Sequence, residues 1–199
     1  MGKLVMSEFV SLDGVIQDPD GQEGFVVGGW VGKVLDHDEL SKVKFDEALA
    51  AEALLFGRRS YEWFAQRWPR RRGDLADRLN SLPKHVVSST LHDPEWTNTS
   101  VLRGEVAKAV SKLKQEVAGD IVVYASFQLL HTLLAHDLVD EMRLTIVPVV
   151  LGAGERLFTR IGDPKPMRLT GIRTVDDQMV LLTYRPARNT LTTARPVRR

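Results

Sequence analysis

The chain has 199 residues, of which 43% are hydrophobic and 27% charged, with a formal net charge of +1 and no cysteine. This composition is typical of a soluble globular protein, and it excludes disulfides, thiol catalysis and cysteine-ligated metal sites. No apolar run approaches the roughly 20 residues of a membrane-spanning helix, and the sequence has no signal-peptide pattern, no HExxH motif and no basic excess typical of nucleic-acid binding. We therefore expect a cytoplasmic protein without a metal ion, a membrane segment or a nucleic-acid partner.

The hydrophobic pattern predicts strands and helices in alternation. Buried strands are expected over residues 4–10, 54–56, 85–88, 101–102, 121–124 and 142–150. Helices are expected over residues 38–51, 59–68 and 105–117, and from the N-cap Ser126 to about Leu138. In the first of these helices, Val43, Ala48 and Leu49 are expected to face the core.

Three further segments complete the pattern. Residues 17–29 are rich in Gly, Asp and Pro and are expected to form a long binding loop. Residues 68–74 are expected to be an ordinary loop. The strands 168–174 and 179–185 flank Asp176-Asp177 and predict an antiparallel hairpin.

This order predicts a single α/β domain over residues 1–185. Its sheet is expected to be mainly parallel, with helices on both faces and an antiparallel edge formed by the C-terminal hairpin. Residues 186–199 carry four arginines and no acid, and we expect a basic, flexible tail there.

Polar residues follow four of the predicted strands, at the edge where ligands of parallel sheets bind. Arginine forks and helix N-termini both suit phosphate groups. Each set alone is more often an ordinary turn, but together they predict one extended anionic ligand across the sheet. The sets are Gly57, Arg58, Arg59 and Ser60; Ser88 and Ser89; Arg103 and Gly104; and Ala125, Ser126 and Gln128.

Two other motifs are interpreted as turns. GAGERL, at Gly152, has Leu157 where a dinucleotide fingerprint requires a small residue. DPDG, at Asp18, lacks the carboxylate spacing of a calcium loop.

Several segments resemble a known family. SLDGVI, LLFGRRSYE, HVVSST and the long block from VVYASFQLL to GAGERLF resemble the dihydrofolate reductase-like superfamily. Within it, they are similar to the branch that contains the C-terminal reductase domain of the bacterial riboflavin biosynthesis protein RibD. The resemblance covers about residues 3–185 and implies a three-layer α/β/α fold with NADPH as cofactor.

The resemblance also implies which residues bind the cofactor. Those that match the family's contacts to the adenosine 2′-phosphate and the pyrophosphate are Gly57, Arg58, Ser60, Ser88, Ser89 and Arg103. Arg59 is expected to be a solvated neighbour or a secondary contact. Those that match the turn into the following helix are Ala125, Ser126, Gln128 and Leu129. In the family this turn usually has Gly-Gly or Gly-Ser, so Ala125 places a methyl group where the backbone approaches the cofactor.

A further segment, Asp13 to Ile16, matches the family's residues beside the nicotinamide, with Val15 and Ile16 as the expected contacts. The loop that follows corresponds to the mobile loop that closes over the ring. Folate reductases also carry a carboxylate on the first helix, and its position falls near Ser41 here. The nearby acids are Asp36, Asp38, Glu39, Asp46 and Glu47, of which Asp38, one turn away, is the candidate catalytic residue.

The leading hypothesis is therefore an NADPH-dependent reductase. It would transfer a hydride to a small heterocyclic or ribosylamino substrate, as in the reduction of 5-amino-6-(5-phosphoribosylamino)uracil. One alternative is a dihydrofolate reductase. Another is a non-catalytic, nucleotide-binding regulatory protein, which Ala125 and Phe127 favour. Family members often pair, so a homodimer is a further expectation of the resemblance.

Overall fold

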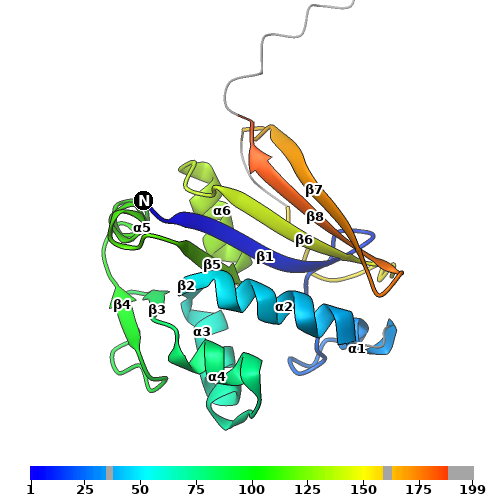
Figure 1. The fold of residues 1–199 in the computed structure, drawn as a ribbon, viewed down its shortest axis with the longest axis horizontal. Coiled ribbons are helices and arrows are strands. Elements are labelled where there is room, and N and C mark those ends of the chain that lie inside the picture. Colours follow the sequence, from blue (N-terminus) through cyan, green and yellow to red (C-terminus); the bar gives the residue numbers. More distant parts are fainter. Residues whose placement is uncertain (35–37, 159–162, 188–199) are drawn as a thin grey trace, which may run out of the picture.

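The computed structural model describes residues 1–34, 38–158 and 163–187. One eight-stranded sheet runs through them, with the strand order β4-β3-β2-β5-β1-β6-β8-β7 (Figure 1). The six strands from β4 to β6 pair in parallel, whereas β8 is antiparallel to both β6 and β7. The strands are β1 (Lys3–Ser11), β2 (Ala51–Gly57), β3 (Lys84–Val87), β4 (Thr99–Leu102), β5 (Asp120–Tyr124), β6 (Glu141–Val147), β7 (Met167–Val175) and β8 (Met179–Pro186).

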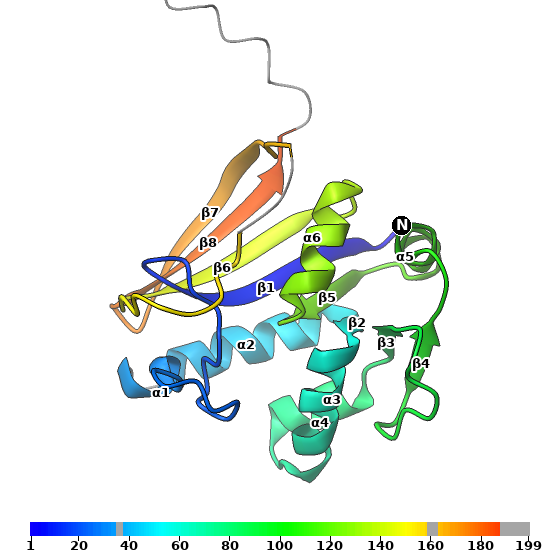
Figure 2. The same ribbon diagram turned by 180° about the vertical axis from the view of Figure 1, so that it is seen from behind.

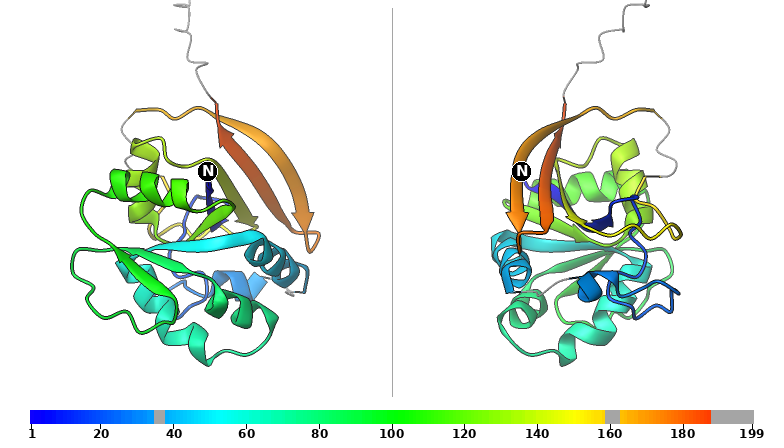
Figure 3. Two further views of the ribbon diagram at one scale, coloured as in Figure 1. Left: turned by 60° about the vertical axis from the view of Figure 1, so that its left-hand side comes forward. Right: turned by 90° about the vertical axis from the view of Figure 1, so that its right-hand side faces the viewer.

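Helices cover both faces of this sheet. The helices are α1 (Trp30–Val34), α2 (Asp38–Ala50), α3 (Arg58–Arg67), the 3-10 helix η1 (Trp68–Arg70), α4 (Asp74–Ser81), α5 (Val106–Glu116) and α6 (Phe127–Ala135). One core cluster packs α5 and α6 on the sheet, and a second packs α2, α3 and α4 on it. Figures 2 and 3 show α2 and α4 on the opposite side of the sheet from α5 and α6. The predicted three-layer α/β/α architecture is confirmed.

The central strand β1 connects the two core layers. Seven of its nine residues are buried, as expected for a parallel strand that is covered on both faces. Leu4 and Met6 belong to the cluster under α5 and α6, and Val5 to the cluster under α2 and α4. Full burial of such side chains stabilises the fold by about 1.5–3 kcal/mol each.

The structure corrects several details of the predicted elements. Helices α1 and α4 were not predicted; α4 is short and polar and buries only Ala76 and Leu79 among its eight residues. Strand β6 ends at Val147, and Val150 beyond it is 68% exposed. Leu49 is 51% exposed because it lies on the solvent side of α2. Most of the basic tail, residues 188–199, lies outside the described residues.

None of the helices in the described part of the chain has the length and apolarity that crossing a membrane requires.

Candidate functional site

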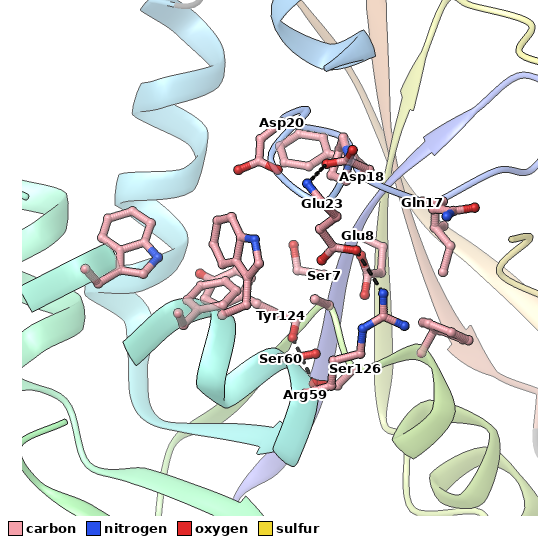
Figure 4. A pocket seen from close by; sticks show the side chains of 18 of the residues that line it. Ser7, Glu8, Gln17, Asp18, Asp20, Glu23, Arg59, Ser60, Tyr124 and Ser126 are labelled. Carbon is pink, nitrogen blue, oxygen red and sulfur yellow. Dashed lines mark hydrogen bonds and ion pairs between the residues drawn. The ribbon is translucent and has the colours of Figure 1, made fainter. Parts of the chain in front are cut away.

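A cavity of about 310 Å³ opens beside the carboxyl ends of β1 and β5 (Figure 4). The chain leaves these neighbouring strands toward opposite faces, because β1 leads to α2 and β5 leads to α6. Such a switch in strand order is the usual ligand site of an open α/β sheet. The cavity is lined by β1, the loop 17–29, α2, α3 and the turn from Tyr124 to Phe127.

One wall of the cavity is aromatic. Trp63, Phe64 and Trp68 come from α3 and η1, and the ring of Phe64 stacks on those of Trp68 and Tyr124 with centroid distances of 6.0 and 6.3 Å. Stacked rings of this kind provide flat, apolar surface at low entropic cost. The wall therefore suits a planar molecule.

Charged groups from α2 and β6 lie under the floor of the cavity. The ammonium group of Lys44 donates a hydrogen bond to Ser7 Oγ at 2.7 Å and lies 3.5 Å from Glu47 Oε1. Arg143 pairs with the other oxygen of Glu47 at 3.3 Å. Burial raises the pKa of Glu47, but Lys44, Ser7 and Arg143 together outweigh burial, and the pKa is lowered overall. Helix α2 thus presents a cation to the cavity and holds its buried carboxylate ionised beneath it.

One of the carboxyl groups that line the cavity comes from β1. Glu8 is 9% exposed, and within the part of the chain that the structure describes no group donates to its buried Oε1. Burial raises the pKa of Glu8 to about 8, although the charge of Lys44 opposes the shift. Glu8 was not predicted, and the sequence signal that would have identified it is an acid between the apolar residues 4–6 and 9–10 of a buried strand.

The predicted binding loop, residues 17–29, closes over the cavity. The buried carboxylate of Asp18 accepts hydrogen bonds from the N–H groups of Glu23 and Phe25, both at 3.0 Å. A Cβ atom at Gly28 would lie 2.3 Å from this carboxylate, so the loop requires glycine there. Glu23 in turn pairs with Arg59 at 3.0 Å across the cavity mouth (Figure 4). Asp18 therefore holds the loop together, in keeping with the turn predicted for DPDG.

The predicted phosphate contacts meet beyond the cavity, at the ends of β2, β3 and β4. Arg58 pairs with Glu62 at 2.7 Å and donates to Thr90. Arg103 donates to the carbonyl groups of Ser89 at 3.1 Å and Leu91 at 2.7 Å. Ser88 Oγ accepts hydrogen bonds from the N–H groups of Thr90 and Leu91. We call the set Arg58, Ser88, Ser89, Thr90 and Arg103 the basic patch.

The turn into α6 has an unusual backbone. Ala125 and Ser126 both adopt left-handed conformations, with φ values of 52° and 64°. Ser126 is the N-cap residue of α6, as predicted, but its hydroxyl accepts from the N–H of Gly57 at 3.0 Å and donates to the carbonyl group of Tyr124 instead of capping the helix. Among the described residues, no side chain caps α6 or α3, whose N-cap is Gly57. Two helix N-termini therefore keep N–H groups for an anion at the same sheet edge.

The left-handed alanine gives a testable prediction. Such a backbone costs an L-residue about 1–2 kcal/mol, which glycine avoids. We expect Ala125→Gly to raise the free energy of unfolding by up to about 1 kcal/mol after the larger entropy of the unfolded glycine is subtracted. Urea unfolding measures this, with Ala109→Gly in α5 as the control that should lose about 1 kcal/mol. A loss of stability in both variants would show that the turn is not strained.

The remaining predicted residues take different positions. Ile16 and Ser60 line the cavity, whereas Val15 is fully buried and does not line it. Gln128 is exposed on the first turn of α6, and Leu129 is buried in the core beside Gly57.

Asp13 holds two loops together and is not among the residues that line the cavity. Hydrogen bonds from the N–H of Leu151, from Ser11 and from the N–H of Gly152 lower the pKa of Asp13 to about 2.

The acids of α2 do not line the cavity where they are described. Glu39 pairs with Arg173 of β7, and Asp46 pairs with Lys42 on the surface. Asp38 begins α2, but its side chain lies outside the described residues, so its catalytic role stays a prediction. Nowhere in residues 1–34, 38–158 and 163–187 do three or more His, Asp or Glu side chains form a group that could hold a metal ion.

Comparisons with known proteins agree with this architecture. Residues 2–181 match the family model described as RibD C-terminal domain. The chain is 28% identical over 189 residues to the uncharacterized protein YyaP of Bacillus subtilis strain 168, which covers 92% of this chain and 94% of that protein.

Two solved structures share the fold. A putative riboflavin biosynthesis protein from Shewanella sp. PV-4 is similar with a TM-score of 0.74 and 20% identity, over 94% of this chain and 99% of the other. Dihydrofolate reductase from Enterococcus faecalis, solved with NADP(H), is similar with a TM-score of 0.59 and 14% identity, over 92% and 96%. The dihydrofolate reductase-like fold expected from the sequence is thereby confirmed.

Proposed function

We propose that this chain, which belongs to the RibD C-terminal domain family, is an NADPH-dependent reductase of a small heterocyclic substrate. One observation carries the proposal. The basic patch, the two uncapped helix N-termini and the cavity follow one another along a single edge of the sheet. An extended anionic cofactor with a reactive ring at one end matches this order of groups.

The donor set fits NADPH group by group. Arg58 and Arg103 provide two fixed cations for a 2′-phosphate, and the Ser88 and Ser89 hydroxyl groups provide further donors. The left-handed turn at Ala125 and Ser126 keeps the glycine-like backbone of a pyrophosphate turn, although neither residue is glycine. When bound, NADPH supplies a hydride from its nicotinamide ring. Ile16 and the closed loop would shield that ring from water.

The charges that line the cavity favour an uncharged substrate. Its three cations are already engaged: Lys44 with Ser7, Arg59 with Glu23, and Arg71 over the ring of Trp68 at 4.5 Å. The acids that line it are Glu8, Asp18, Asp20, Glu23 and Glu155. Because the loop acids and Glu155 repel a second phosphate, we favour a neutral heterocycle over a phosphoribosylamino compound.

The alternatives have less support. A dihydrofolate reductase would need a carboxylate on α2, and the α2 side chain described in the cavity is Lys44. A non-catalytic binding protein was suggested by Ala125, but the backbone of that turn has kept the conformation that a glycine would adopt. A homodimer stays a prediction of the family resemblance, to be checked by light scattering.

The proposed function is tested by titrating the protein with NADPH and NADH while nucleotide fluorescence is followed. We expect micromolar affinity for NADPH and weaker binding of NADH. Oxidation of NADPH is then followed with a panel of acceptors that includes dihydrofolate, aminouracils and neutral aromatic carbonyl compounds. If neither nucleotide bound, the cofactor assignment and the reductase function would both be wrong.

Gly57 gives a sharper prediction at the same site. A Cβ atom there would lie 3.7 Å from Leu129 and 3.9 Å from Ser126, which are ordinary contacts, and the backbone of Gly57 is one that alanine adopts. We therefore expect Gly57→Ala to leave thermal stability nearly unchanged but to weaken NADPH binding severalfold, because the methyl group enters the ligand's path. If Gly57→Ala and the wild type bound NADPH equally well, the pyrophosphate would not lie beside Gly57.

A further inference from the structure

Glu8 is a buried carboxyl group, and the described part of the chain provides no hydrogen-bond partner for its Oε1. Its backbone is paired within the sheet, beside Leu144 of β6, while its side chain lines the cavity just beyond the end of β5. Oε1 is fully covered by protein, and no donor among the described residues reaches it. A buried oxygen without a partner costs roughly 1–3 kcal/mol, so such a group requires an explanation, of which a catalytic role is one.

The cations described near Glu8 pair with other groups. Lys44 is the cation that acts on it most, but the Lys44 ammonium group already bonds Ser7 and lies near Glu47. Arg59, at the mouth, is paired with Glu23. The other titratable and charged groups that line the cavity are Lys44 from α2, Arg59 from α3, Arg71, Tyr124 from β5, Asp18, Asp20 and Glu23 from the loop, and Glu155; Glu47 of α2 lies beneath the cavity and also acts on Glu8.

We propose that Glu8 is the hydrogen-bond and proton donor to the carbonyl or imine group of the molecule that is reduced in the cavity. This inference rests on the proposed reductase function. A neutral carboxyl group can both donate and accept a hydrogen bond, whereas a carboxylate only accepts. Because burial raises the pKa of Glu8 to about 8, the group is protonated near pH 7 and is able to donate.

The proposed reduction transfers one hydride and one proton. The carbon of the C=O or C=N bond gains a hydride, and NADPH becomes NADP⁺. The heteroatom gains the proton of Glu8, so the double bond becomes an alcohol or an amine. Glu8 is left as a carboxylate and regains a proton from solvent when the loop opens.

The first test needs neither cofactor nor turnover. An acid whose pKa is higher in the folded chain than in the unfolded chain loses stability as pH rises between the two values. As pH rises from about 5 to about 8, the wild type should therefore lose stability that Glu8→Gln keeps. The melting temperature of Glu8→Gln minus that of the wild type should increase over this range. The control Glu105→Gln, at an exposed pair with Lys108, should follow the wild type. A difference between Glu8→Gln and the wild type that does not change with pH would overturn the proposal.

The second test separates a ligand role from a merely structural one. The probe is 2-quinolone, a planar, uncharged lactam. The control compound is naphthalene, which is similar in shape but has no carbonyl group. Calorimetry measures the affinity of the protein for each compound. We expect the wild type to bind 2-quinolone more weakly above pH 8. Glu8→Gln, which keeps a donor, should bind it without that pH dependence, and Glu8→Leu should lose at least tenfold in affinity. Naphthalene binding should not depend on pH. Absence of 2-quinolone binding, or equal binding by Glu8→Leu, would overturn the proposal.

Turnover gives a third readout. For acceptors reduced in the panel above, Glu8→Gln should lower kcat by about 10²–10⁴-fold while the Kd for NADPH is unchanged. Failure of the proposed function is distinguishable, because it would appear as absent NADPH binding in wild type and variant alike. Unchanged kcat in Glu8→Gln would contradict the role of Glu8 alone.

Discussion

Replacing Arg143 with methionine should lower the free energy of unfolding by about 3–5 kcal/mol, the usual cost of leaving buried charges without their partner. Arg143 lies on β6 under α2, and its side chain is 20% exposed. It lies 3.3 Å from Glu47, 3.2 Å from Asp120 and 2.7 Å from Glu141, of which Glu47 and Glu141 are nearly inaccessible. Methionine keeps most of the volume but removes the charge that these three carboxylates share, which leaves Glu47 with Lys44, Glu141 with Arg185, and the carboxylates close together.

The effect of this change should depend on pH. Burial raises the pKa values of Glu47 and Glu141, but their hydrogen-bond and basic partners outweigh burial, so both pKa values are lowered in the folded chain. Groups of this kind stabilise the fold above their unfolded pKa, and their contribution is lost as pH falls through the lower, folded value. The difference between wild type and Arg143→Met should therefore shrink below about pH 4.

Urea unfolding at pH 7 and at pH 3.5 measures both effects. Arg173→Met is the matched control, because Arg173 pairs with Glu39 at an exposed site, where a single pair contributes about 1 kcal/mol or less. Equal losses in the two variants at pH 7 would show that the Arg143 cluster is as weakly coupled as a surface pair.

Replacing Arg58 with alanine should weaken NADPH binding by about 1–3 kcal/mol, or roughly 5- to 150-fold, the range of charge-assisted hydrogen bonds. NADH, which lacks the 2′-phosphate, should bind about equally well to both proteins. The Arg58 guanidinium group already meets Thr90 and is half exposed, so its loss should change stability little.

Fluorescence titration at two salt concentrations checks this prediction. Arg70→Ala removes the same charge from the exposed end of η1 and controls for net charge. If Arg58→Ala weakened NADPH and NADH alike, the arginine would contact a group common to both nucleotides, and the 2′-phosphate assignment would fail.

The fold could be predicted because its signals are local and repeated. Short, mainly apolar segments marked the buried strands, and their alternation with amphipathic helices predicted a mainly parallel sheet. The basic patch, apart from Thr90, followed from the same rule, since residues after parallel strands gather at one edge. Helix α4 was not predicted because it is short and stabilised by tertiary contacts, which periodicity does not report.

The cavity itself could be predicted only in part. Trp63 and Trp68 look like ordinary core residues of a helix, and their place at a ligand wall depends on where α3 packs. Ser126 was assigned as an N-cap from its residue type, but the sharp turn after β5 uses its hydroxyl to hold Gly57 instead. Glu8 lies on β1 within the sheet and Lys44 on α2, which packs against the sheet, so only the tertiary structure brings them to one cavity.

The central position of β1 also sets the order in which the molecule is completed during synthesis. Lys3 lies opposite Asp120 of β5, and Val5 lies opposite Glu141 of β6. A growing chain therefore carries its first strand without either partner until more than half of the sequence has been made. Pairing that spans such a separation closes a large loop and forms slowly. Glu8 and Ser7 lie on this strand, so the cavity is assembled at the end of folding, and shortened chains that stop before β6 should be protease-sensitive and unable to bind a nucleotide.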